Sequence, residues 1–262
     1  NSSNVVERAI EYWNGDEGKC GIVTLCWHWC PAARYDKSKS DPWGTFYTDK
    51  TKFNLARAMN GRDPDGYQML LDDIDAIAVQ LKRLQDADVP VLWRPLHEAS
   101  GGWFWWGASG ADAYLQLYKL MYERLTNVHG LNNLIWVWNG QDAAWYPGDE
   151  YVDIIGEDIY PGKHVYTSQA ARFIKALSYT DTRKLITLSE NGCIPDPEQL
   201  VRDNIMWSYW CVWEGEFVLK AAGFNNYSEQ YTEKNMLKKA YKSDTVITRK
   251  ELPDLRNYPL GD

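Results

Sequence analysis

The chain has 262 residues, a length that suits one barrel-sized domain, and its 45% hydrophobic and 24% charged residues allow a sizeable core. Its net charge of −8 argues against a nucleic-acid partner, because such partners need a basic surface. There is no run of 18 apolar residues, so we expect no membrane-spanning helix and no membrane partner. The 14 Trp and 17 Tyr stand against only 6 Phe. Trp and Tyr combine a flat apolar face with a polar group, so their excess in an acidic chain suggests carbohydrate binding.

Six short apolar runs, each bounded by turn residues, predict buried parallel β-strands. In chain order they cover residues 21–27, 89–98, 133–139, 153–160, 184–190 and 207–213. Helical patterns separate most of these runs, which is the arrangement of βαβ units around a parallel sheet. With no internal repeat and no low-complexity linker, residues 1–262 are predicted to form a single α/β domain.

The helical patterns begin with a segment at 4–14 that leads directly into the first strand. Apolar residues then recur at helical spacing from Leu70 to Leu84, after an Asp63-Pro64 start. The next helix follows Ser109 and Asp112, which fit a capping box. Further helices are predicted to begin near Ser168, at Asp196-Pro197 and near Glu233. Residues 28–62 show no strand and little periodicity, but their aromatic residues suit a wall of a binding cleft.

Polar or aromatic residues stand at or just after the C-terminal end of every predicted strand: His28, His97, Glu98, Asn139, Asp158, Tyr160, Glu190 and Trp213. In parallel barrels the reactive side chains gather at this edge. Two carboxylates on separate strands, Glu98 and Glu190, suggest glycoside hydrolysis, in which one carboxyl donates a proton and the other attacks the anomeric carbon. Glu98 stands among Trp and Gly residues, where desolvation raises the pKa of a carboxyl group and suits a proton donor.

The same residues could instead have purely structural roles. A glutamate at a strand end often serves only as a salt-bridge partner, and Arg94 could pair with Glu98 or Glu190. The stretch CWHWC at 26–30 could form a zinc site with Cys20, but it lacks a C-x-x-C pair and a second His at ligand spacing. We therefore expect no metal and no cofactor, and we expect Cys26 and Cys30 to pack or to form disulfides.

The stretch VPVLWRPLHEASGGWFWWG at 89–107 resembles the signature of glycoside hydrolase family 26, whose members are mostly β-mannanases. Similar stretches follow the family's order: CGIVTLCWHW (20–29), GEDIY (156–160) and LSENG (188–192). The resemblance implies a TIM-type (β/α)8 barrel with its acid/base after strand four and its nucleophile after strand seven. Counting back, the run at 21–27 becomes strand three. We therefore expect the working enzyme to contain two strands that precede residue 1.

The resemblance also implies roles for individual residues. Glu98 matches the acid/base and Glu190 the nucleophile. The implied neighbours are His97, which orients the acid/base and contacts sugar, and Tyr160, which hydrogen-bonds the nucleophile. The role of Arg94 is interpreted from the residues alone: its charge would hold the nucleophile ionised. The implied sugar contacts are His28, Trp103 at the cleaved sugar, and Trp213 as a stacking platform, with Trp210 as its competitor. Asp158 is implied either to contact the sugar or to support residues that do. Trp105 and Trp106 are open between packing and sugar contact.

From these matches we expect a secreted, monomeric retaining endo-β-1,4-mannanase that acts on mannan, glucomannan or galactomannan. Two Asn-x-Ser sequons, at Asn1 and Asn226, accord with secretion. One alternative keeps the fold and mechanism but acts on mixed-linkage glucan or xylan, or releases mannobiose from chain ends. Another is a non-catalytic carbohydrate-binding domain, which would use the same Trp platforms without needing two glutamates on separate strands.

Overall fold

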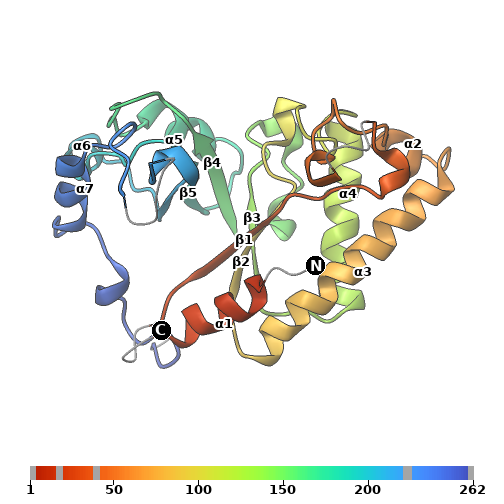
Figure 1. Cartoon of the computed structure of the whole chain (residues 1–262), viewed down its shortest axis with the longest axis horizontal. Helices are drawn as coiled ribbons and strands as arrows, with labels where there is room; N and C mark the ends of the chain where they lie inside the picture. The colour runs from red at the N-terminus through yellow and green to blue at the C-terminus, as the bar shows by residue number, and fades with distance from the viewer. Residues whose placement is uncertain (1–3, 16–19, 38–41, 221–225, 259–262) are drawn as a thin grey trace. The chain divides into compact units, whose positions relative to one another are not determined.

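The computed structural model describes residues 4–15, 20–37, 42–220 and 226–258. The chain divides into two compact units: unit 1, Asn1–Asp16 with Gly21–Asp153, and unit 2, Glu17–Cys20 with Ile154–Asp262. Figure 1 colours the chain from red at the N-terminus to blue at the C-terminus and labels the helices α1–α7 and the strands β1–β5. The assignment of residues 1–262 to a single domain stays a prediction.

Unit 1 holds three parallel strands: β1 (Val23–Trp27), β2 (Val91–Pro95) and β3 (Leu134–Trp138). The strand β2 is central in this unit, since Val91 lies opposite Val23 on one side and opposite Leu134 on the other. Four of its five residues are buried, as expected of an apolar run covered on both faces.

The helices of unit 1 are α1 (Val5–Asn14), α2 (Leu55–Met59), α3 (Pro64–Asp86) and α4 (Ala111–Glu123), which continues as a π-helical turn (Arg124–Val128). The long helix α3, orange in Figure 1, begins where predicted, because the Asp63 side chain accepts a hydrogen bond from the Gly66 N–H. The Arg124 guanidinium binds both carboxylate oxygens of Asp75 at 2.6 Å. This bidentate ion pair joins α3 to the end of α4.

The predicted capping box at the start of α4 is wrong. The residue that precedes the helix is Gly110, with φ 85° and no side-chain cap. Only glycine adopts this backbone conformation readily, so the chain enters the helix after it. The Ser109 hydroxyl instead accepts a hydrogen bond from the Ala56 N–H of α2 at 3.3 Å. The helix α2 itself was not predicted, because its five residues are too short to show a helical period.

A cavity of about 650 Å³ lies in unit 1 and is lined by residues of α1, β1 and α3. Its lining combines apolar side chains such as Leu25, Trp27 and Leu81 with polar ones such as Gln80. Among the described residues of unit 1, the side chains of α1, β1 and α3 therefore do not fill the space between them.

Unit 2 holds the parallel strands β4 (Ile154–Ile159), β5 (Leu185–Asn191) and β6 (Trp210–Val212) and the helices α5 (Ala170–Leu177), α6 (Pro197–Asp203) and α7 (Lys234–Tyr241). Every residue of β4 is buried, including Glu157. The Glu157 carboxylate accepts hydrogen bonds from Arg172 Nε and Tyr179 Oη, each at 2.9 Å. Since Arg172 belongs to α5, this buried carboxylate fastens that helix to β4.

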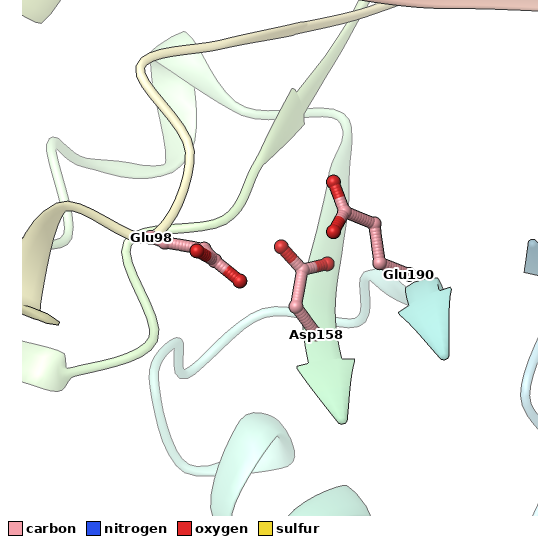
Figure 2. Close-up of side chains that lie close together, drawn as sticks. All are labelled: Glu98, Asp158 and Glu190. Atoms are coloured by element: carbon pink, nitrogen blue, oxygen red, sulfur yellow. The ribbon is translucent and has the colours of Figure 1, made fainter. Parts of the chain in front are cut away.

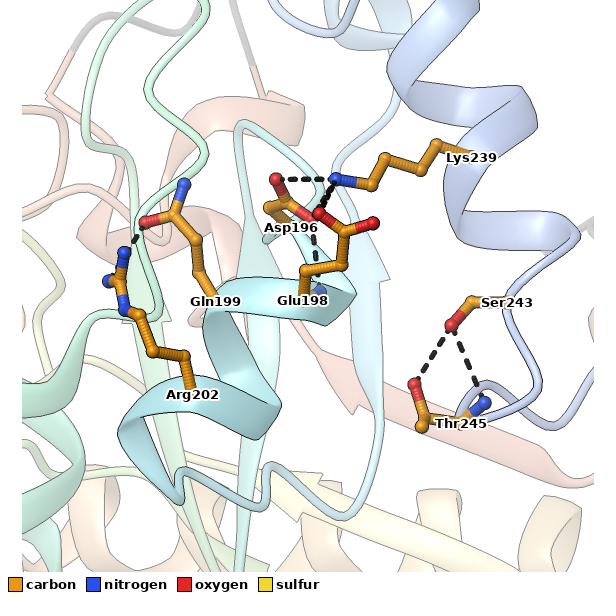
Figure 3. A network of polar contacts seen from close by, with 7 residues as sticks. All are labelled: Asp196, Glu198, Gln199, Arg202, Lys239, Ser243 and Thr245. Carbon is orange, nitrogen blue, oxygen red and sulfur yellow. Dashed lines mark hydrogen bonds and ion pairs between the residues drawn. The ribbon is translucent and has the colours of Figure 1, made fainter.

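A second ionic contact joins two helices of unit 2 (Figure 3). The Lys239 ammonium of α7 lies 2.8 Å from Asp196 Oδ1 and 2.7 Å from Glu198 Oε2. The Asp196 carboxylate also accepts the Glu198 N–H at 3.0 Å, which caps α6. The predicted start of α6 at Asp196-Pro197 is thereby confirmed.

All six predicted strands are present, five of them with shorter bounds than the apolar runs suggested and β5 shifted by one residue. The run at 89–98 shortens most, to Val91–Pro95. The two strands expected before residue 1 stay a prediction. Among the described residues, no helix combines the length and the apolar character needed to cross a bilayer. The sequon at Asn1 lies outside the described residues, whereas Asn226 is exposed.

Candidate active site

Glu98 follows β2 in a backbone conformation that L-residues rarely adopt. Its φ is 52°, and that of Leu96 is 53°. Such conformations persist only where surrounding contacts impose them, and they gather at functional sites. The Glu98 N–H donates to the Asn139 carbonyl at 2.7 Å, and Trp103 Nε1–H donates to Glu98 Oε2 at 2.9 Å. The end of β3 thus fixes the Glu98 backbone, and an indole fixes its carboxylate.

The glycines of this loop make room for the Trp103 indole. A Cβ added at Gly101 would lie 2.1 Å from the Trp103 ring, so no other residue fits there without moving the ring. Trp103 is still 47% exposed. The loop therefore holds the indole N–H on Glu98 and leaves much of the ring surface accessible to a ligand.

Arg94 and His97 lie buried behind Glu98 on the same stretch of chain. Arg94 is 4% exposed, and its Nη1 donates to Asn139 Oδ1 at 2.7 Å. His97 is 2% exposed, and its Nδ1 has no hydrogen-bond partner among the described residues. Burial and the nearby charges of Arg94 and His28 hold the pKa of His97 well below its ordinary value. The His97 ring is therefore neutral at pH 7. The predicted ion pair of Arg94 with either glutamate stays a prediction.

The structure separates the Trp residues that the sequence left open. Trp105 and Trp106 are 1% and 0% exposed. Their indole nitrogens donate to the carbonyls of Trp29 (2.5 Å) and His97 (2.8 Å). Both rings are core packing beneath the loop. His28 is half-buried, and its ring meets the edge of His97 at 4.8 Å between centroids.

In unit 2, Asp158 of β4 and Glu190 of β5 lie directly opposite each other (Figure 2). Their carboxylate oxygens lie within 4.8 Å of one another. This pairing depends on a β-bulge, because Glu157 pairs with Leu188 and Asp158 with Glu190, which leaves Ser189 as one extra residue in β5. Side chains opposite each other in parallel strands share a face. The bulge therefore brings both carboxylates to one face of the sheet.

Each of these two carboxylates accepts a hydrogen bond from a hydroxyl group. Tyr160 Oη donates to Glu190 Oε2 at 2.6 Å, and Ser189 Oγ donates to Asp158 Oδ1 at 2.7 Å. Glu190 and Asp158 are 4% and 6% exposed, whereas Tyr160 is 42% exposed. Hydrogen bonds to a charged acceptor are short and strong, so the two donors restrict how the carboxylates can turn.

Trp213 follows β6, and its N–H donates to the Asn191 carbonyl at 3.0 Å. Trp213 and Trp210 are both half-buried, so burial does not choose between them as a stacking platform. Ser189 was missing from the predicted residues of the site, and Asn139 was predicted as a strand-end residue without a role. The strand-end position of Asn139 was a usable signal. Ser189 had none, because the bulge that re-aims it is a matter of strand register.

The comparison with known families decides the relationship. The model of glycosyl hydrolase family 26 matches residues 1–251. The chain belongs to glycosyl hydrolase family 26. The resemblance stated from the motif at 89–107 is thereby confirmed.

This family 26 chain is similar to curated relatives over nearly all of its length. It is 46% identical to the mannan endo-1,4-beta-mannosidase of Thermothelomyces thermophilus, over 94% of this chain and 48% of the relative. It is 38% identical to mannan endo-1,4-beta-mannosidase A of Piromyces sp, over 95% of this chain and 38% of the relative. The chain spans about half the length, or less, of these relatives.

Solved structures of family 26 confirm the fold class. The GH26-CBM35 β-(1,4)-mannanase of Podospora anserina matches with a TM-score of 0.86 and 41% identity, over 96% of this chain and 54% of that one. A β-mannanase from a symbiotic protist of the termite Reticulitermes speratus, complexed with gluco-manno-oligosaccharide, matches at 0.81 and 36%, over 97% and 73%. The predicted partial (β/α)8 barrel is confirmed, and the described residues hold six of its strands.

Proposed function

We propose that this family 26 chain carries the catalytic residues of a retaining endo-β-1,4-mannanase. The similarity to mannan endo-1,4-beta-mannosidases over almost the whole chain supports the activity. The observation that carries the proposal is that Glu98 and Glu190, at two strand ends, each accept a hydrogen bond from a positioned ring donor. A non-catalytic binding domain would have no use for this arrangement.

In the proposed reaction Glu98 protonates the glycosidic oxygen while the Glu190 carboxylate attacks the anomeric carbon. The bond to the leaving sugar breaks, and a covalent mannosyl-enzyme forms on Glu190. In the second step Glu98 takes a proton from water, the water oxygen attacks the anomeric carbon, and the bond to Glu190 breaks. Two displacements at one carbon restore the original anomeric configuration.

The remaining site residues receive supporting roles in this proposal. Trp103 offers its exposed ring to the sugar at the cleavage site, and Trp213 offers a further platform. The neutral His97 ring and His28 contact sugar hydroxyls, as does Asp158, whose carboxylate Ser189 holds in place. Arg94 supports the end of β3 beside Glu98 through its hydrogen bond to Asn139.

A panel of four polysaccharides, tested on the full-length protein, checks the proposal. Galactomannan, glucomannan, lichenan and xylan are incubated separately, and reducing ends, viscosity and products are followed. We expect mannans to lose viscosity early and to give mixed oligosaccharides, with the β-anomer appearing first in proton NMR. Hydrolysis of lichenan or xylan alone would contradict the mannan assignment, mannobiose as the sole early product would contradict endo action, and binding without cleavage would remove the enzyme proposal.

We also propose that the protein is secreted and monomeric. A polysaccharide is too large to enter a cell, so hydrolysis must occur outside, and the exposed sequon at Asn226 accords with passage through a secretory route. Fractionation of the producing organism, with light scattering on the purified protein, tests both statements. Activity confined to the cytosol would refute the first, and a stable dimer would refute the second.

A further inference from the structure

Tyr160, which donates a hydrogen bond to Glu190, is an exposed residue. Tyr160 lies just beyond the end of β4, and its ring is 42% exposed. A tyrosine in this setting can take several side-chain rotamers, of which only some bring its hydroxyl to Glu190. Its hydrogen bond of 2.6 Å therefore needs neighbours that fix the ring.

Phe217 is such a neighbour. Its ring centroid lies 5.3 Å from that of Tyr160, with the two planes inclined at 56°. Gly192 closes the contact from below, since a Cβ added there would lie 3.1 Å from Phe217 Cε1 and 3.3 Å from Tyr160 Cδ1. The Tyr160 ring is therefore confined between the backbone after Glu190 and the face of Phe217.

Phe217 rests in turn on Tyr231, whose ring centroid lies 4.2 Å away. The Tyr231 carbonyl accepts the His164 N–H at 3.0 Å, and the Cys193 Sγ lies 3.0 Å from it and 2.9 Å from the Gly162 carbonyl. Its hydroxyl donates to Glu216 Oε1 at 3.1 Å. Tyr231 is thus anchored at its backbone and at the tip of its ring, and it forms a rigid support behind Phe217.

The turn that carries Phe217 is also fixed. The 3₁₀ turn Gly215–Phe217 follows β6 and begins at a glycine with φ 62°. Directly after it, the Val218 carbonyl accepts the Ser228 N–H at 3.0 Å, and Leu219 bridges to Tyr227. The loop after β6 is therefore tied to the chain around Tyr231, and Phe217 is held from both sides.

We propose that Phe217 is a positioning residue for the nucleophile, acting through the ring of Tyr160. Tyr231, Phe217 and Tyr160 form a row of three rings in mutual contact, which we call the ring ladder. Through the ring ladder, the loop that follows β6 determines how often the Tyr160 hydroxyl bonds Glu190. The catalytic consequence rests on the proposed function, whereas the effect on the Tyr160–Glu190 hydrogen bond does not.

The first test is structural and needs no substrate. Crystal structures of the wild type, Phe217→Ala and Phe217→Leu report the distance from Tyr160 Oη to the Glu190 carboxylate. We expect the alanine variant to lose the short contact or to show more than one Tyr160 rotamer, and the leucine variant to be intermediate. An unchanged ring with its hydrogen bond intact in Phe217→Ala would overturn the proposal.

The second test is a kinetic double-mutant cycle on a mannan substrate. Tyr160→Phe removes a hydrogen bond to a charged group and is expected to lower kcat by about 10- to 100-fold. Phe217→Ala weakens the same bond without deleting it, so we expect a fall of about 3- to 10-fold in kcat with KM little changed. In the Tyr160→Phe background, Phe217→Ala should have almost no further effect. Additive losses would show that Phe217 does not act through Tyr160.

Matched variants separate this role from general stability. Phe173, also half-buried in unit 2, packs its ring on Trp207 at 5.0 Å, so Phe173→Ala removes comparable packing away from Tyr160. It should lower the melting temperature and leave kcat unchanged. Gly192→Ala adds a methyl group against both rings and should lower kcat as Phe217→Ala does. If the wild type cleaves no β-glycan, the proposed function fails, and the Tyr160–Glu190 distances alone decide on Phe217.

Discussion

Glu98 in unit 1 and Glu190 in unit 2 are held in place by different kinds of contact. The Glu98 carboxylate accepts a hydrogen bond from Trp103, five residues along the chain. Glu98 itself lies in a loop, with its backbone in the left-handed region. Glu190 lies within an extended strand and is bound by Tyr160, which directly follows the neighbouring strand and lies 30 residues away in the sequence. The first arrangement is local in sequence, and the second exists only after strands β4 and β5 have paired.

This difference predicts how substitutions in each unit affect its glutamate. The loop around Glu98 carries the donor to its carboxylate and the glycine that admits the Trp103 ring, and the Asn139 carbonyl adds one backbone contact from the end of β3. The surroundings of Glu190 depend on strand register and on a ring from the loop after β6. We therefore expect substitutions far from the chemistry to act on the nucleophile more readily than on the acid/base.

The largest expected effects separate the two carboxylates by chemistry. Glu98→Ala should lower turnover on mannan by about 10²- to 10⁴-fold, the usual contribution of a general acid. On an activated aryl β-mannoside, whose leaving group needs no proton, Glu98→Ala should retain its first step and accumulate the covalent intermediate. Glu190→Ala should be inactive on both substrates.

Pre-steady-state kinetics with a dinitrophenyl substrate measure this difference. Glu150, an exposed carboxylate in unit 1, provides the matched control as Glu150→Ala and should keep full turnover. Equal losses on mannan and on the aryl glycoside for Glu98→Ala would contradict its assignment as the proton donor.

The two ring donors are expected to differ in a smaller but measurable way. The Tyr160 hydrogen bond reaches a carboxylate that is 4% exposed, whereas Trp103 binds a half-buried carboxylate. Removing the more buried bond with Tyr160→Phe should lower kcat by about 10- to 100-fold, and Trp103→Phe by only about 2- to 10-fold. Steady-state kcat values on one mannan give the comparison. A larger loss for Trp103→Phe than for Tyr160→Phe would contradict the expected difference between the two units.

The acid dependence of stability should trace to unit 1. The folded protein holds the pKa of His97 well below its ordinary value of about 6.5, so the unfolded chain binds a proton there before the folded one does. Above pH 6.5 both forms are neutral and the difference vanishes. As pH falls below about 6.5, the free energy of unfolding should drop by up to about 1.4 kcal/mol per pH unit from this residue.

Urea denaturation at pH 7.5, 6.5 and 5.5 measures this slope in the wild type and in His97→Gln. The variant should be less stable at pH 7.5 but should lose less stability on acidification. Parallel slopes in the two proteins would show that His97 does not take up the proton on unfolding.

The smallest effect is expected at the contact between α6 and α7 in unit 2 (Figure 3). The Lys239 side chain is 34% exposed and that of Glu198 is 80% exposed, so water and salt screen their ion pair. The second partner of Lys239, Asp196, is 12% exposed and is screened less. Lys239→Ala should lower the melting temperature by about 1–3 °C, and less in high salt. Lys238→Ala, on the same helix and exposed, removes the same charge and should change nothing. A fall of kcat in Lys239→Ala would mean that this contact reaches the nucleophile.

The sequence predicts best what depends on local pattern. Apolar runs predict β1 to β6 because strands covered on both faces must be apolar. The period from Leu70 to Leu84 predicts the helix α3, which is 23 residues long in the structure. The motif at 89–107 contains both Glu98 and its donor Trp103, so that half of the site is visible in one stretch. The helix α2 is too short to show a period, and the Gly110 turn that displaces the capping box depends on a backbone angle that no pattern reports.

The remaining features of the site depend on pairing across the chain. Alternation along β5 places Ser189 and Glu190 on opposite faces, and only the register with β4 shows that a bulge intervenes. The contact between Phe217 and Tyr160 joins residues 57 positions apart without any motif. Such contacts follow from the shape of the folded unit and leave no periodic signal.

The extra residue at Ser189 means that the number of residues in β5 decides which face of the sheet Glu190 occupies. With the bulge, Glu190 shares a face with Asp158; with one residue fewer in β5, the alternation would turn Glu190 away from Asp158 and toward the side of Glu157. Chain length in this strand is thus under tighter constraint than side-chain identity. A substitution at Ser189 removes one hydroxyl, whereas its deletion reverses the orientation of the residue proposed to attack the substrate.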